Sequence, residues 1–407
     1  MPRILLSAVL AAVCPALAPA GAVAVPANDQ PALAARALLP DTSWPAPFAG
    51  VPNTEPVDAP GARQPVGGFS ALLDAPGVGN FFAMSDNGFG SKANSRSFLL
   101  RLYLVHANFE TAWGGAGDVR VLRAITLRDP DRKVPFAIVR EGTSERLLTG
   151  GDFDIESVRI DRRGTLWFGD EFGPFLLHTD LSGKVLGAPI PLPDVKSPDY
   201  PADVPSPVAG TANLGPSGGF EGMALSADGR RLLPVLEGAV AGDDPTVRRI
   251  YEFDLRGRSY TDTRRTYRVA DPSLHVSDFT VLRGDRFVSL ERDNLQGTAA
   301  THKRAFVVDL DDAQPDGSVA KREVTDLLDL ADPAGISLPG RPGDIGLGDP
   351  FAMPYVTIES VLPVLGGRYL AIVNDTNFGS TGRNPALPDD SDFVVVRVPG
   401  LKDGAGR

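Results

Sequence analysis

Short apolar stretches, rich in β-branched and aromatic residues and separated by Gly, Asp and Pro, make up most of the chain. This pattern is typical of β-strands that are joined by tight turns. The clearest stretches cover residues 165–169, 249–255, 305–310, 369–373 and 393–398. We find no long helical period, and the best helix candidate is the short segment 324–330. The pattern therefore predicts an all-β protein.

Five segments repeat one design, in which a small or acidic residue opens a strand, a turn follows, and a second strand ends in an acid. The copies cover residues 67–91, 153–173, 218–238, 275–294 and 356–380. When they are aligned, the equivalent opening residues are Ser70, Glu156, Glu221, Ser277 and Glu359. The closing acid follows at the same spacing in the first, third and fifth copies, as Glu237 follows Glu221, and slightly earlier in the second copy, as Asp170 follows Glu156. The repeat predicts five related hairpins.

Each copy has the dimensions of an antiparallel hairpin, with two strands of about six residues and a turn of about four. A hairpin returns the chain to its starting end, so the opening residue and the closing acid lie close together. If each hairpin is the inner half of a propeller blade, these ends gather on one rim around the axis. The long intervals 91–152 and 294–356 then hold insertions or a degenerate blade. We therefore expect a β-propeller, with six blades favoured and five or seven as alternatives.

Residues 1–24 have the features of a secretory signal peptide, with Arg3 before an apolar stretch and small residues that allow cleavage after Ala20 or Ala24. Residues 25–60 are rich in Pro and Ala and predict a leader that becomes ordered near Leu38 or later. Residues 61–400 form the predicted propeller domain. Cys14 is the only cysteine, so the mature chain forms no disulfide. We expect a secreted or periplasmic protein without a membrane span.

The charge of the chain narrows the choice of partners. A formal net charge of −11 argues against binding to nucleic acid and to anionic membranes, and it suits the binding of cations. We expect a small-molecule partner, while the oligomeric state stays open.

The predicted rim carries many carboxylates, which are ligands that calcium prefers. Without a cation, so many acids in one place would repel one another and raise one another's pKa values. We therefore expect calcium to be bound there, in unknown number, by Asp86, Asp170, Glu171, Glu237, Glu291, Asp293 and Asp375. In the alternative interpretation, the acids cap turns or pair with arginines such as Arg159 and Arg292.

Several linked motifs resemble the phytase-like family, also described as esterase-like activity of phytase. The motifs lie at residues 153–157, 164–174, 218–224, 358–360 and 374–379, and the resemblance extends over residues 65–398. The family is similar in architecture to the β-propeller alkaline phytases, which are calcium-dependent phosphomonoesterases. The calcium-site pattern of those phytases has no residue-for-residue match in this chain.

This resemblance, together with the acidic rim, predicts an exported calcium-dependent hydrolase of phosphate monoesters with a metal-activated water as nucleophile. The predicted residues are Glu156, Glu221 and Glu359 for catalysis, and Lys92, His178, Arg292 and Arg383 for binding the substrate. Each of these cations also has a simpler interpretation as a loop residue or an ion-pair partner.

Two other functions stay open at this stage. One is the hydrolysis of lactones or other esters on the same propeller, which an apolar pocket at the rim would favour. The other is a non-catalytic propeller that binds a ligand or a protein, in which any calcium is structural only. A metal-free rim closed by salt bridges would favour this function. A Gly-x-Ser-x-Gly nucleophile motif does not occur, and the four histidines lack the spacing of a helical zinc site, so we interpret them as isolated residues.

Overall fold

Antiparallel hairpins follow one another along the chain and form four-stranded groups. The structure, a computed structural model, describes residues 30–41 and 64–401, and the predicted signal peptide lies outside them. Within these ranges the one helical element is the 3₁₀ turn Gly297–Ala299. No helix of the described part of the chain has the length and apolar character to cross a membrane. The expected all-β class is therefore confirmed.

The strands are as follows. The first group holds β2 (Phe69–Asp74), β3 (Asn80–Ser85), β4 (Arg101–Asn108) and β6 (Asp118–Thr126), and the second holds β7 (Ile155–Ile160), β8 (Leu166–Asp170), β9 (Phe175–Thr179) and β10 (Ile190–Pro191). The third holds β11 (Phe220–Leu225), β12 (Arg231–Leu236), β13 (Val247–Asp254) and β14 (Ser259–Arg268). The fourth holds β15 (His275–Arg283), β16 (Arg286–Arg292), β17 (Lys303–Ala313) and β18 (Val319–Asp326). The fifth holds β19 (Thr357–Val364), β20 (Tyr369–Asp375), β21 (Ser391–Arg397) and β1 (Ala32–Leu39), and the short β5 (Glu110–Thr111) pairs with β1.

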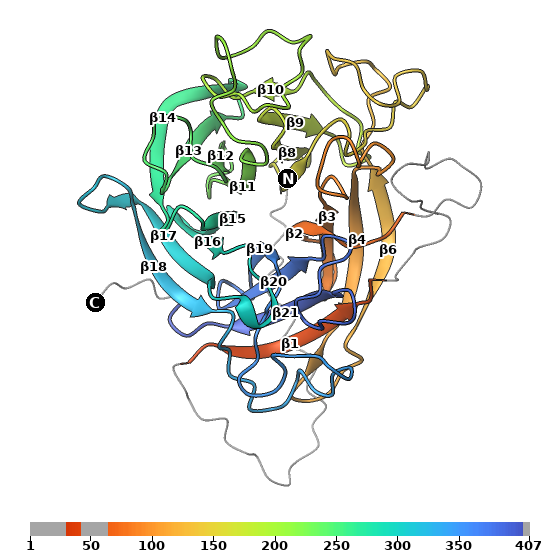
Figure 1. Cartoon of the computed structure of the whole chain (residues 1–407), viewed down its shortest axis with the longest axis vertical. Coiled ribbons are helices and arrows are strands. Elements are labelled where there is room, and N and C mark those ends of the chain that lie inside the picture. Colours follow the sequence, from red (N-terminus) through yellow and green to blue (C-terminus); the bar gives the residue numbers. More distant parts are fainter. Residues whose placement is uncertain (1–29, 42–63, 402–407) are drawn as a thin grey trace.

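The first strands of the five groups form a closed ring. β2 contacts β7, β7 contacts β11, β11 contacts β15, β15 contacts β19, and β19 returns to β2. Figure 1 shows the groups arranged around this common centre. Each group is therefore one blade of a β-propeller, and the first and fifth blades are joined by one parallel pair between β1 and β6.

The described strands fall into five four-stranded groups, whereas the sequence favoured six blades. The long intervals of the sequence explain the difference, because they contain outer strands and loops instead of another blade. Residues 91–152 supply β4 and β6, and residues 294–356 supply β17 and β18.

Apolar side chains fill each junction between neighbouring blades. The described core divides into five clusters, and each cluster combines residues from two adjacent blades. Between the second and third blades, for example, Trp167 and Leu176 pack with Phe220 and Tyr251. Burial of large apolar side chains is the main favourable term in folding, so the ring of junctions holds the blades together.

The helix expected at residues 324–330 is wrong. Residues 324–326 end β18, and a turn follows. Leu327 and Leu330 are fully buried in the junction between the fourth and fifth blades. Their spacing resembles the period of a helix, but here it arises from a turn that directs both side chains into the core.

The first described strand begins earlier in the chain than expected. The sequence predicts order from near Leu38, but β1 already begins at Ala32 and pairs antiparallel with β21. The pairing partner lies at the other end of the chain, so the local sequence gives little sign of this strand. β1 completes the fifth blade.

Gly169 on β8 marks a place where two blades approach closely. A Cβ atom there would lie 2.4 Å from Oγ of Ser157 and 2.9 Å from the backbone oxygen of Phe220. We expect Gly169→Ala to destabilise the protein by about 1–3 kcal/mol, because backbone and packed side chains must shift. Urea denaturation measures this, with Gly142→Ala as the control, since a Cβ at Gly142 meets nothing within 4 Å. Equal stability of the two variants would contradict the prediction.

Candidate functional site

A β-bulge opens the innermost strand of every blade. The register of the first two strands shifts between Phe69 and Ala71, Ile155 and Ser157, Phe220 and Gly222, Val276 and Asp278, and Ile358 and Ser360. The five residues within these shifts are the opening residues that the sequence repeat aligned. Bulges redirect side chains and often lie beside functional sites. The sequence repeat therefore corresponds to five β-bulges, which lie at one end of the propeller axis.

Three bulge residues and the ends of neighbouring strands bring buried carboxyl groups together. We call this set the acidic cluster, and it consists of Asp86, Asp154, Glu156, Asp170, Glu171, Glu221, Glu237, Glu359 and Asp375. Each of these side chains is buried. The second blade supplies four of them, and the fourth blade supplies none.

The fourth blade instead contributes a cation to the cluster. The Nη2 group of Arg292 lies 2.9 Å from Oε1 of Glu359, 3.1 Å from Oε1 of Glu237 and 3.5 Å from Oε1 of Glu221. His275 lies beside it, with Nδ1 3.0 Å from Oε1 of Glu237. Glu221, Glu237 and Glu359 therefore fit the alternative interpretation from the sequence, in which acids of the rim pair with arginines.

Other members of the cluster accept hydrogen bonds from nearby turns. Oδ1 of Asp86 accepts from the backbone of Gly88 at 2.9 Å. Asp170 accepts from the backbones of Asp154 and Gly173 at 2.9 and 2.8 Å. Asp375 accepts from the backbone of Asn377. These carboxylates act at least as turn caps.

Three oxygens of the cluster accept no hydrogen bond from the part of the chain that the structure describes. They are Oδ1 of Asp154, Oε2 of Glu156 and Oε1 of Glu171, and all three are buried. The same three residues can place one oxygen each within 4.8 Å of one another. Buried carboxylates without partners are costly unless they are protonated or bind a cation. The oxygen donors and their spacing fit a hard divalent cation such as calcium.

Burial and mutual repulsion raise the pKa values across most of the cluster. Burial raises the pKa of Asp154 to about 6 and that of Glu359 to about 8. Burial and the neighbouring carboxylates raise the pKa values of Glu156 and Glu171 well above the usual range. For Glu237, burial acts in the same direction, but His275 and Arg292 outweigh it and lower the pKa. The cluster therefore retains protons near neutral pH unless a cation replaces them.

Two residues of the site were absent from the prediction. Asp154 lies two positions before Glu156 in the same opening motif. This closeness in sequence is the feature that could have identified Asp154 as a member of the site. His275 was interpreted as isolated, but it borders the cluster through Glu237. His275 begins β15, on the same rim as the other opening residues, and this position could have identified it as a neighbour of the cluster.

Two predicted metal ligands point elsewhere. Glu291 contacts Lys321 and Tyr267 between the outer parts of the third and fourth blades. Asp293 forms an ion pair with Lys303 at 2.8 Å and caps a turn. Successive side chains of a strand face opposite sides, so the strand that directs Arg292 inward directs Glu291 away.

Three predicted substrate-binding cations also have other surroundings. His178 stacks on Trp167 with ring centres 4.0 Å apart, on the third strand from the axis. Arg383 is buried against Asp392, 3.2 Å away. Lys92 donates to the backbone of Asp199 and lies 5.2 Å from the ring centre of Phe172, next to Glu171 in the chain. Of the four predicted cations, Arg292 is the one whose contacts place it in the cluster.

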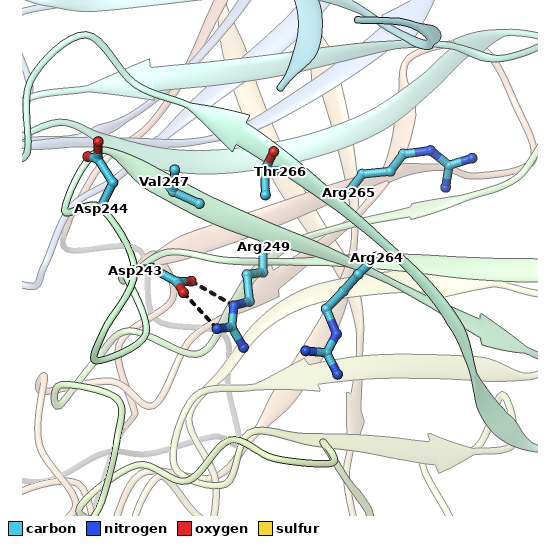
Figure 2. Close-up of a pocket in the computed structure, with 7 residues that line it drawn as sticks. All are labelled: Asp243, Asp244, Val247, Arg249, Arg264, Arg265 and Thr266. Atoms are coloured by element: carbon cyan, nitrogen blue, oxygen red, sulfur yellow. Dashed lines mark hydrogen bonds and ion pairs between the residues drawn. The ribbon is translucent and has the colours of Figure 1, made fainter. Parts of the chain in front are cut away.

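A hollow of about 340 Å³ lies on the outer strands β13 and β14 (Figure 2). Its acids already have partners, because Asp243 pairs with Arg249 at 2.7 Å and Asp244 pairs with Arg268 at 2.9 Å. None of the residues that line this hollow belongs to the acidic cluster. We therefore consider the cluster as the candidate site.

Comparison with known families supports the resemblance. The family model described as "Phytase-like: Esterase-like activity of phytase" matches residues 64–378. The chain belongs to this family. The match includes every residue of the acidic cluster.

Individual relatives are more distant. An uncharacterised secreted protein of Arthroderma benhamiae is 27% identical over 186 residues, which cover 37% of this chain and 36% of that protein. This chain thus spans about a third of that relative.

Among solved structures, similar chains include a luciferin-regenerating enzyme (13% identity, 82% of this chain and 78% of that chain, TM-score 0.36). A periplasmic gluconolactonase of Pseudomonas aeruginosa has 12% identity over 82% of this chain and 86% of that chain, with a TM-score of 0.34. A β-1,3-galactosidase has 10% identity over 88% of this chain and 60% of that chain, with a TM-score of 0.44. All three structural likenesses are distant.

Proposed function

We propose that the protein is an exported, calcium-dependent hydrolase of phosphate monoesters that acts at the acidic cluster. The observation that carries the proposal is the set of three unpartnered buried oxygens on Asp154, Glu156 and Glu171. Family membership supports hydrolysis of an ester bond. The signal-like segment 1–24 and a relative described as secreted support export.

A divalent cation bound here would polarise a phosphoryl oxygen and lower the pKa of a bound water. Asp154, Glu156 and Glu171 would hold it, since each offers one carboxylate oxygen within 4.8 Å of the others. Carboxylates of the cluster that do not bind the cation, such as Glu221 and Glu359, would accept the proton of the attacking water, once the bound cation has favoured their ionised forms. Arg292 would contribute positive charge next to the substrate anion.

The charged character of the site favours a phosphate ester over a lactone. The groups that meet at the cluster are carboxylates and the guanidinium of Arg292, whereas a lactone or carboxylic ester would call for an apolar lining. A non-catalytic ligand-binding propeller is the second candidate. The observation in its favour is that Arg292 already pairs with three of the carboxylates.

Removal and return of calcium tests the proposal. We expect EGTA-treated protein to lose phosphomonoesterase activity and to unfold at a lower temperature, and calcium to restore both in parallel. Calcium at about 100 times its Kd would stabilise the fold by about 2.7 kcal/mol. Stabilisation without activity on phosphate esters, lactones or carboxylic esters would favour the ligand-binding candidate. An absence of any calcium response would overturn the metal mechanism.

Glu171→Gln is expected to lower the calcium-dependent activity by at least about 10–100-fold, since even outer-shell partners of metal sites have effects of that size. Glu171 is central because it belongs to both possible cation groups. The steady-state rate at saturating calcium measures the loss. The matched control is Glu323→Gln on the exposed part of β18, which is expected to keep the wild-type rate. An unchanged rate in Glu171→Gln would exclude this residue from the site.

A further inference from the structure

The acidic cluster contains two overlapping groups of potential cation ligands. One consists of Asp154, Glu156 and Glu171, and the other consists of Glu171, Glu221 and Glu237. In each group, one oxygen per residue lies within 4.8 Å of the others. On spacing alone, the cluster offers ligand groups for two neighbouring cations that share Glu171.

The partners of the two groups differ. Each residue of the first group keeps one buried oxygen that accepts no hydrogen bond from any described residue. In the second group, the guanidinium of Arg292 lies 3.1 Å from Glu237 and 3.5 Å from Glu221. A fixed positive charge therefore already occupies the second position, while the first position has none among its described contacts.

Neighbouring side chains hold Arg292 in this place. Its Nη1 group donates to Oδ1 of Asn294. The side-chain amide of Asn294 lies 3.1 Å from Nε2 of His275, whose Nδ1 is 3.0 Å from Glu237. Glu359 also accepts from Arg292 at 2.9 Å. This closed set of contacts keeps the guanidinium between Glu221, Glu237 and Glu359.

We propose that the chain binds one divalent cation, at Asp154, Glu156 and Glu171, and that Arg292 takes the place of a second cation at Glu221 and Glu237. The inference deepens the proposed function by defining its metal site, and it concerns binding alone. Arginine is suited to this role because it stays charged and presents several donors in a fixed plane. A second cation beside this charge would meet both repulsion and occupied ligand oxygens.

The number of bound calcium ions tests this inference. Isothermal titration of the full mature chain with calcium chloride is expected to give one site per chain. Arg292→Gln is expected to give two sites, because the ligands of the second group become free, while Arg292→Lys keeps a positive charge and is expected to give one. Two sites in the wild type, or a single site in Arg292→Gln, would overturn the role of Arg292.

Two further variants locate the site without depending on Arg292. Asp154→Asn is expected to weaken calcium binding by at least about tenfold, whereas Glu237→Gln is expected to weaken it by much less, because Arg292 already pairs with Glu237. The reverse order would overturn the location. Circular dichroism and thermal unfolding establish that each variant is folded before titration. The absence of calcium binding in the wild type would mean that Asp154 and Glu156 share a proton instead, and this would overturn the inference.

The titration separates this inference from the proposed function. One calcium site with the expected variant pattern, but without hydrolysis of any ester, would leave the inference standing and refute the hydrolase. Calcium-dependent hydrolysis of a phosphate ester, together with a single calcium site in Arg292→Gln, would support the hydrolase and refute the role of Arg292.

Discussion

Replacing Asp392 with alanine is expected to destabilise the folded protein by about 3–5 kcal/mol, the usual effect of removing one partner from a buried ion pair. Asp392 is fully buried on β21 and accepts from Arg36 of β1 at 2.9 Å. It also accepts from Arg383 at 3.2 Å and from the hydroxyl of Tyr355 at 2.8 Å. The substitution would leave two buried guanidinium groups without their shared carboxylate.

Urea denaturation monitored by tryptophan fluorescence measures this change in the free energy of unfolding. The control is Glu323→Ala, which removes one partner of the half-exposed pair with Arg304. Exposed pairs contribute about 0–1 kcal/mol, so the control is expected to stay close to the wild type. Similar losses in the two variants would show that the contacts of Asp392 do not secure the closure of the ring.

The calcium-free protein is expected to become less stable as the pH rises from 5 to 9. Burial raises the folded-state pKa of Asp154 and Asp375 to about 6, of Asp170 to about 7 and of Glu359 to about 8. In the unfolded chain these groups titrate near pH 4. Between these values the folded state binds more protons, so the stability is complete below about pH 4 and is lost as the pH rises through 6–8.

Calcium is expected to reverse this trend, because a bound cation replaces the protons and favours ionised carboxylates. The rise in melting temperature that calcium produces should therefore grow with pH. Scanning calorimetry between pH 5 and 9, with EGTA or with excess calcium, measures both effects. A calcium-free melting temperature that increases over this range would contradict the assigned protonation of the cluster. Glu171→Gln serves as the matched variant, in which the calcium effect should shrink.

The repeat in the sequence predicted the hairpins and the rim because both depend on local spacing. The positions of Glu156, Glu221 and Glu359 follow from this repeat, and the structure places all three at bulges on one end of the axis. The number of blades did not follow from it, because the outer strands have no shared motif. Whether a long interval holds two outer strands or another blade is decided by pairing between distant segments.

Side-chain direction limited the prediction of the site. Lys92 and Arg383 follow rim motifs in the chain, yet they contact Asp199 and Asp392, and this nearness in sequence gave no information on where they point. Glu291 and Arg292 are adjacent, but alternation along β16 sends them to opposite sides. Asp154 was overlooked because the alignment of the repeats selected one opening residue per copy.

The pairing of β1 with β21 has a consequence for the order of folding. Arg36 and Asp392 are separated by 356 positions. β1, the first described strand, therefore cannot complete its pairing until β21, the last described strand, has been synthesised. The first four blades can form from consecutive hairpins, but the fifth needs both extremes of the chain at once. A contact of such long range delays the final step of folding and favours slow, all-or-none closure. A nascent chain that stops before β21 would leave β1 with only short pairings, such as those to β5 and β6, and Arg36 without Asp392, so an incomplete product would expose an edge of β1 to quality control.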